Sequence, residues 1–132
     1  MQLRFQLLPD TYVVAKLAAP VPAFPTGTKP RALFSLTFTD DEISLVCEEN
    51  SMPASAVCTN IQRDWRALKI EGVLDFSLVG ILARISGLLS AKNISIFALS
   101  TYNTDYILVQ SKSLSSAMSA LRADGHEVFE QG

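Results

Sequence analysis

The sequence contains few of the residues that carry metal or nucleophilic chemistry. Among 132 residues there are one histidine, two cysteines and one tryptophan. A single histidine without a CxxC pair cannot supply the ligands of a structural zinc ion, and neither a phosphate-binding P-loop nor a GxGxxG motif is present. We therefore expect no metal, no other cofactor, no catalytic residue and no enzymatic activity.

Charge of one sign and long apolar runs are also scarce. The 11 basic and 13 acidic residues give a net charge of -2, and no run of five like charges occurs. This balance suits neither nucleic-acid phosphates nor an anionic membrane. The apolar runs are too short to cross a bilayer, and the N-terminal residues lack the apolar stretch of a signal peptide. We expect a cytoplasmic protein that binds no nucleic acid and no membrane.

The few reactive side chains leave two alternatives open. Cys47 and Cys58 are the only cysteines; without a secretory signal, two reduced thiols are the favoured state, although a disulfide would also satisfy the count. A cysteine could also pair with His126 as nucleophile and base, but only if the fold brought them together.

The first half of the chain is rich in strand patterns. Residues 2–8 and 12–18, separated by a turn signal at Pro9, favour a hairpin. Four of the six prolines lie in residues 20–30, which excludes a helix there. Residues 33–39 alternate polar and apolar side chains, and residues 43–47 form the returning strand. The polar residues 48–64 predict a loop and a module boundary, with modules at residues 1–62 and 63–132.

The second half has the element order β-α-β-β-α-β. Residues 65–73, 94–101, 105–111 and 126–130 predict strands, and apolar stripes predict two helices between them. This order is the ferredoxin-like α+β plan, a four-stranded antiparallel sheet with both helices on one face. Strand 94–101 is apolar on both sides, so we expect both of its faces to be covered.

The first helix has the clearest signals. One continuous apolar stripe is formed by Leu78, Ile81, Leu82, Ile85, Leu88 and Leu89. Ser77 is placed as its N-cap, Phe76 and Ile81 have the spacing of a hydrophobic staple, and Asn93 would end the helix in the left-handed conformation.

The turn before this helix is the first candidate binding site. The backbone N–H groups of a first helical turn attract a carboxylate, and Asp75 beside them could accept from an ammonium group. Gly80 would let a ligand approach closely. A helix start next to an acid suits an amino acid, although Asp75 and Ser77 would equally serve as helix-capping residues without any ligand.

The second candidate is the polar segment from Ser100 to Asp105, between two apolar strands. Its alternative is an ordinary hairpin turn, with Asn103 left-handed and Asp105 bonded locally. Within one module this turn need not lie beside the turn that precedes the first helix. Contact of one ligand with both would then require a second module.

At these residues the sequence resembles a known family. The segment GVLDFSLVGILARISGLLSAKNISIFALSTYNTDYILV is similar to an ACT domain, the small-molecule-sensing module of amino-acid metabolic enzymes. It resembles the ACT pairs of aspartokinase regulatory regions, the CASTOR-type cytosolic arginine sensors, and small bacterial proteins with two ACT-like modules. Residues 1–62 would then be a divergent, strand-rich ACT-like module before an ACT domain at 63–132.

The resemblance implies a regulatory protein that binds an amino acid between ACT modules of a homodimer and acts on a partner in trans. Arginine would fit, because Asp105 can pair with a guanidinium. The alternative is a structural or oligomerisation module without a ligand. The ligand-binding residues that the resemblance implies are Asp75, Ser77, Leu78, Gly80, Ile81, Thr101, Tyr102 and Asp105.

Overall fold

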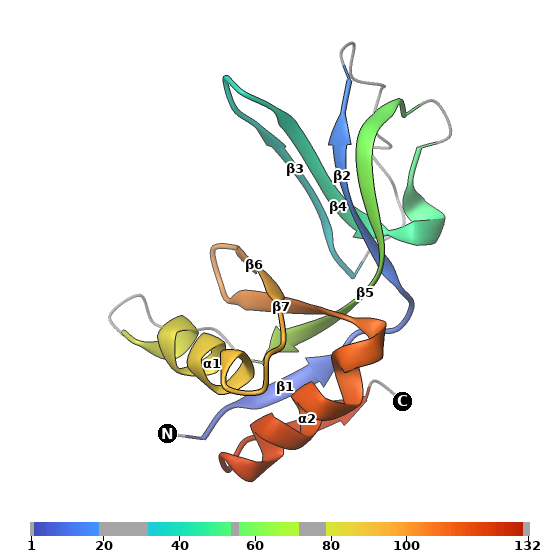
Figure 1. The fold of residues 1–132 in the computed structure, drawn as a ribbon. Helices are drawn as coiled ribbons and strands as arrows, with labels where there is room; N and C mark the ends of the chain where they lie inside the picture. Colours follow the sequence, from blue (N-terminus) through green and yellow to red (C-terminus); the bar gives the residue numbers. More distant parts are fainter. Residues whose placement is uncertain (1, 19–31, 54–55, 72–78, 131–132) are drawn as a thin grey trace. The chain divides into compact units, whose positions relative to one another are not determined.

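The computed structural model describes residues 2–18, 32–53, 56–71 and 79–130 (Figure 1). Its strands are β1 (Arg4–Leu7), β2 (Tyr12–Leu17), β3 (Phe34–Phe38), β4 (Ile43–Glu48), β5 (Cys58–Ile70), β6 (Ile96–Ser100), β7 (Asp105–Gln110) and β8 (Glu127–Glu130). The helices are α1 (Ile81–Ser90) and α2 (Leu114–Ala123), with short 3₁₀ turns η1 (Glu49–Ser51) and η2 (Ser111–Ser113).

The chain forms two compact units, and their composition differs from the predicted boundary. One unit is Asp10–Trp65, and the other combines Met1–Pro9 with Arg66–Gly132. The first strand therefore belongs with the C-terminal elements, not with residues 10–62. Strand β5 runs through both units, and it begins at Cys58, inside the stretch that the sequence predicts as a loop.

The larger unit is a five-stranded sheet rather than the four-stranded sheet that the element order predicts. Its order is β6-β7-β5-β1-β8. Strand β1 pairs antiparallel with β5 and parallel with β8, with Phe5 opposite Ile70 on one side and Val128 on the other. The first strand is thus inserted between the first and last strands of the β-α-β-β-α-β plan.

The predicted hairpin of residues 2–18 is wrong. Strand β2 pairs with β4 and β5, whereas β1 pairs with β5 and β8. The turn at Pro9 is present, with Asp10 at a φ of 70°. It separates two strands that join different units, because pairing partners depend on the whole sheet and not on the local turn.

Both helices of the larger unit pack on one face of its sheet, as predicted (Figure 1). The buried side of α1 is Ile81, Ile85 and Leu89, with Leu82 and Leu88 packed at its margin. This confirms the predicted stripe from Ile81 onward. The sheet supplies the other half of this core, namely Leu3, Phe5, Leu7, Leu68, Ile70, Ile107, Val109 and Val128.

Strand β6 is less covered than its apolar sequence predicts. Among the described residues it pairs only with β7, so it lies at the edge of the sheet. Ile96, Phe97 and Leu99 are half-buried, and Ala98 is exposed. An edge strand with one partner leaves part of each face open to solvent, which the apolar count alone cannot reveal.

The smaller unit is an antiparallel sheet in the order β3-β4-β2-β5. One face of it is apolar, since alternate residues of each strand point to the same side. Its buried residues are Val13, Ala15, Leu17, Leu45 and Cys47, with half-buried Phe34, Leu36, Ile43, Met52, Ala56, Cys58 and Ile61 against them.

The two cysteines lie on this face but far apart. Cys47 is opposite Val13 and Cys58 is opposite Leu17, on the two different neighbours of β2. Two strand spacings and four residues of rise separate their Cα atoms by roughly 16 Å. A disulfide needs less than about 7 Å, so both residues are thiols.

Candidate functional site

The N-terminus of α1 is formed by a glycine and not by the predicted serine cap. The helix begins at Ile81, three residues later than predicted, and Gly80 is its N-cap with a φ of +82°. The first intrahelical bond runs from the Arg84 N–H to the Gly80 carbonyl at 2.9 Å. The N–H groups of Ile81 to Ala83 precede it and have no partner within the helix, which makes this end suitable for an anion.

The role of Gly80 is conformational. A Cβ placed on Gly80 meets nothing within 4 Å, and the same holds for Gly87 inside α1. We expect Gly80→Ala to lower the free energy of unfolding by about 1–2 kcal/mol, because left-handed backbone is costly for alanine. Gly87→Ala is the matched control and should raise it by about 0.5–1 kcal/mol through helix propensity. Urea unfolding of both variants measures the difference; an equal effect at the two sites would contradict the conformational role.

The turn between β6 and β7 is closed by its own polar groups. The Thr101 N–H donates to the Thr104 carbonyl at 2.8 Å, and the Thr101 hydroxyl donates to the same oxygen at 3.2 Å. The Ser100 hydroxyl donates to Asp105 Oδ1 at 2.5 Å. Asp105 is thus bonded locally, as the hairpin alternative expects, and Asn103 is absent from the residues with positive φ in the described chain.

Thr104 brings this turn to the end of β5. Its side chain is buried, and its hydroxyl donates to the Ile70 carbonyl at 2.7 Å. Ile70 is the last residue of β5, directly before the connection that leads to α1. The β6–β7 turn and the end of β5 therefore lie at the same end of one unit. Most of the first candidate segment, up to Leu78, lies outside the described residues. In a β-α-β unit the two strands are parallel, so the carboxyl ends of β5 and β6 lie at the same end of the sheet.

The structure describes five of the eight predicted ligand residues. Thr101 and Tyr102 are exposed, Tyr102 to 81%, and Asp105 is half-buried. Gly80 is exposed, whereas the Ile81 side chain lies in the core and only its backbone faces the helix end. The remaining three, Asp75, Ser77 and Leu78, lie outside the described residues, as does Phe76 of the predicted staple.

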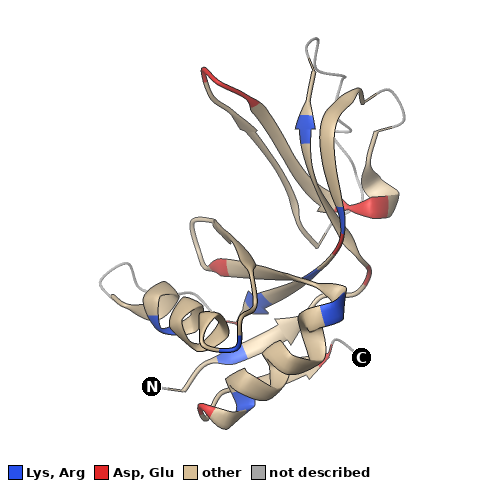
Figure 2. Ribbon diagram, in the orientation of Figure 1, with Lys and Arg blue, Asp and Glu red and all other residues tan. Residues whose placement is uncertain are grey.

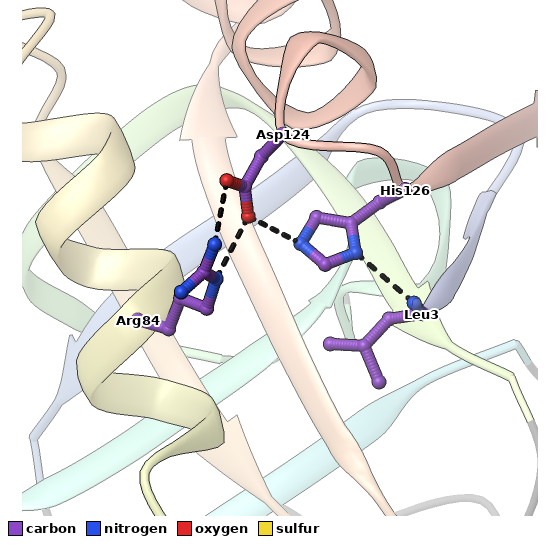
Figure 3. A network of polar contacts seen from close by, with 4 residues as sticks. All are labelled: Leu3, Arg84, Asp124 and His126. Carbon is purple, nitrogen blue, oxygen red and sulfur yellow. Dashed lines mark hydrogen bonds and ion pairs between the residues drawn. The ribbon is translucent and has the colours of Figure 1, made fainter. Parts of the chain in front are cut away.

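A second polar cluster joins α1, α2 and β1 in the larger unit (Figure 3). Arg84 donates to both oxygens of Asp124 at 2.8 Å, and Asp124 Oδ2 lies 2.9 Å from Nε2 of His126. His126 Nδ1 accepts from the Leu3 N–H at 3.0 Å. The sequence offers no signal for this network, because Leu3 and Arg84 are far in sequence from Asp124 and His126.

The two hydrogen bonds from Arg84 to Asp124 determine how the pKa values in this cluster shift. The Arg84 guanidinium lowers the pKa of the Asp124 carboxyl, mainly by hydrogen bonding, and the carboxylate in turn raises the pKa of Arg84. Both nitrogens of His126 are engaged, with a backbone amide and with this carboxylate. The network includes neither cysteine, so the geometry does not support the nucleophile–base pair.

The remaining charges are of both signs on both units (Figure 2). The acidic residues Asp40 and Asp41 lie at the turn between β3 and β4. Within the described ranges no group of three or more His, Cys, Asp or Glu side chains is placed to hold a metal ion. In the same part of the chain, neither helix is long and apolar enough to cross a membrane.

Comparison with known proteins gives consistent results. The family model of the ACT domain matches residues 60–123. The "Cytosolic arginine sensor for mTORC1 subunit 1" of Bos taurus is 32% identical over 106 residues, covering 75% of this chain and 32% of that protein. Its Homo sapiens counterpart is 29% identical over 112 residues, or 80% of this chain and 34% of that protein. The chain spans about a third of the length of these curated relatives.

Solved structures match along almost the whole chain. Protein Atu0741 of Agobacterium tumefaciens has a TM-score of 0.82 and 29% identity, covering 100% of this chain and 96% of that one. The regulatory subunit of aspartate kinase from Thermus thermophilus has a TM-score of 0.61 at 9% identity, covering 90% and 95%. At that low identity the second match shows the fold alone.

The sheet with two helices on one face is the ferredoxin-like α+β fold. Residues 60–123 belong to the ACT-domain family. This confirms the resemblance that the segment from the end of β5 to β7 carries in the sequence.

Proposed function

We propose that this chain is an amino-acid-binding regulatory protein whose ligand lies between ACT modules of a homodimer. In this proposal the chain regulates a partner protein in trans and catalyses no reaction itself. The relatives that support this function are the cytosolic arginine sensors. In an isologous dimer two equivalent ligand sites would form. The proposed divergent ACT-like module is the N-terminal half without its first strand, which pairs within the larger unit.

The observation that carries the proposal is the bond from Thr104 to Ile70. This bond holds the polar β6–β7 turn against the carboxyl end of β5, at one end of the sheet of the larger unit. The Gly80 end of α1 follows that strand after the connecting segment and offers amide donors for a ligand carboxylate. One module could therefore supply both groups, and the second module would cover the ligand.

The proposed division of roles follows from charge. The α1 N-terminus would bind the ligand carboxylate, with Asp75, Ser77 and Leu78 contributing from the connecting segment. Asp105 would accept from a cationic side chain or ammonium group, with Thr101 and Tyr102 beside it. Arginine fits this arrangement because a guanidinium pairs well with a carboxylate. The Ser100 hydroxyl already orients the Asp105 carboxylate at 2.5 Å.

The alternative function is a structural or oligomerisation module without a ligand. The local bonds of the β6–β7 turn favour it, since Ser100 donates to Asp105 and Thr101 donates to the Thr104 carbonyl without any ligand. The two functions differ in whether amino acids stabilise the fold.

We expect thermal shift measurements with the twenty amino acids to single out a cationic one. A ligand at 100 times its Kd adds about 2.7 kcal/mol of stability. Asp105→Asn keeps an oxygen for Ser100 and removes the charge, so it should weaken a cationic ligand by about tenfold to a hundredfold. Neutral amino acids and the oligomeric state should not change. If no amino acid shifts the melting curve at millimolar concentration, the ligand-free alternative holds.

A further inference from the structure

His126 makes two hydrogen bonds that fix the position of its proton. Its Nδ1 lies 3.0 Å from the backbone nitrogen of Leu3, and an amide N–H can only donate. Nδ1 must therefore carry no proton, which places the proton on Nε2, where it is donated to Asp124 at 2.9 Å. The imidazole has no exposed surface, so in this geometry it is neutral and in a single tautomer.

The imidazole extends the pairing between β1 and β8 (Figure 3). The Leu3 carbonyl accepts from the Glu127 N–H at 2.9 Å, and the Leu3 N–H donates to Nδ1 of His126. A side chain thus replaces the backbone carbonyl that would otherwise continue the ladder. This matters because β1 is the inserted strand between β5 and β8, and Leu3, just before it, already lies in the core.

We propose that His126 is a proton-operated clamp on β1: the neutral imidazole holds Leu3, and the imidazolium releases Leu3 while it stays on Asp124. A proton on Nδ1 points at the Leu3 N–H, so two donors face each other and the bond is lost. The bond to the Asp124 carboxylate becomes charge-assisted and stronger. Protonation therefore breaks the hydrogen bond of His126 to Leu3 and strengthens its hydrogen bond to Asp124 at the end of α2.

The charged groups nearest to the imidazole come from the two helices. Asp124 faces the imidazole from the end of α2, and Arg84 of α1 bonds that carboxylate. Arg4 of β1 and Glu127 of β8, which follow Leu3 and His126 in the sequence, are exposed and pair with each other at 3.1 Å. The ring of Phe5, edge-on at 5.8 Å, is uncharged.

Asp124 does not set the response in the neutral range. Its pKa is lowered from the ordinary 3.8, so its stabilising contribution is complete above that value and is lost only as pH falls through the lowered one. Histidine is the side chain that changes charge between roughly pH 5 and 8. His126 is the only histidine in the sequence, so a pH response that disappears when His126 is replaced is assigned to this imidazole.

Amide hydrogen exchange at Leu3 tests the clamp in the full-length chain. Between about pH 7.5 and about pH 5.5, the protection of the Leu3 amide should fall about fivefold or more after correction for intrinsic exchange, since one hydrogen bond is lost. The Ile94 amide, bonded to Leu89 at 3.0 Å, is the internal control and should keep its protection. Equal protection of Leu3 at both pH values would overturn the proposal.

A variant and a spectroscopic measurement complete the test. In His126→Asn the amide oxygen takes the position of Nδ1 and cannot be protonated, so Leu3 protection should not depend on pH. The same fall in this variant as in the wild type would also overturn the proposal. Should the variant not fold, nitrogen NMR of the wild-type imidazole decides. The Nε2–H tautomer must give way to the doubly protonated ring as Leu3 protection falls, and release from a ring that stays neutral refutes the clamp.

Discussion

Replacing Phe5 by alanine is expected to lower the free energy of unfolding by about 3–5 kcal/mol, the usual cost of deleting a buried phenylalanine. Phe5 has no exposed surface and lies in the main core of the larger unit. It is opposite Ile70 and Val128 in the sheet and contacts the ring of His126 edge-on. Since small domains are stable by only about 5–15 kcal/mol, the loss is a large part of the total.

The matched control is the same substitution at an exposed position. Phe38 ends β3 and is 62% exposed, so Phe38→Ala should change the free energy of unfolding by less than about 0.5 kcal/mol. Urea unfolding followed by circular dichroism measures both. If Phe5→Ala cost no more than Phe38→Ala, the first strand would not be part of the C-terminal core, and the predicted boundary at residue 62 would hold after all.

Local patterns predict the elements of this fold well. The spacing of Ile81, Ile85 and Leu89 gives the buried side of α1, because a helical period of 3.6 residues brings them to one face. Asn93 has a φ of 58° and Gly125 one of 92°, as expected for residues that end helices. These features depend on neighbours within a few residues, so they can be predicted from the local sequence.

The partner of each strand cannot be predicted from the local sequence in the same way. The alternation of Phe5 and Leu7 with polar neighbours predicts a strand with one buried side, and this is correct. Nothing in those residues distinguishes β2 from β5 or β8 as the partner, since all present apolar side chains on the facing side. The insertion of β1 is a non-local choice, settled by the total apolar area that the five strands bury together.

The candidate site shows the same limit. Sequence patterns select the Gly80 end of α1 and the polar turn from Ser100 to Asp105, yet they give no distance between them. Thr104, the residue that ties the polar turn to the end of β5, is not among the predicted ligand residues. A threonine in a polar turn is most often exposed, and only the fold shows that its hydroxyl is buried against Ile70.

Thr104→Val should therefore have a double effect. Valine has the same shape as threonine but lacks the hydroxyl, so the Ile70 carbonyl loses a buried donor and the free energy of unfolding should fall by about 1–3 kcal/mol. The β6–β7 turn would lose its tie to β5, and under the proposed function any amino acid that stabilises the wild type should bind more weakly. Urea unfolding measures the first effect and calorimetric titration the second.

The control for Thr104→Val is the same replacement on a surface strand. Thr37 is exposed on β3, and Thr37→Val should leave stability within about 0.5 kcal/mol and binding unchanged. Loss of stability in Thr104→Val without loss of ligand affinity would show that the tie to Ile70 serves folding only. The amino-acid site would then have to lie elsewhere than at the shared end of β5 and β6. Loss of both supports a site at this edge, because one hydroxyl is then required by the sheet and by the ligand.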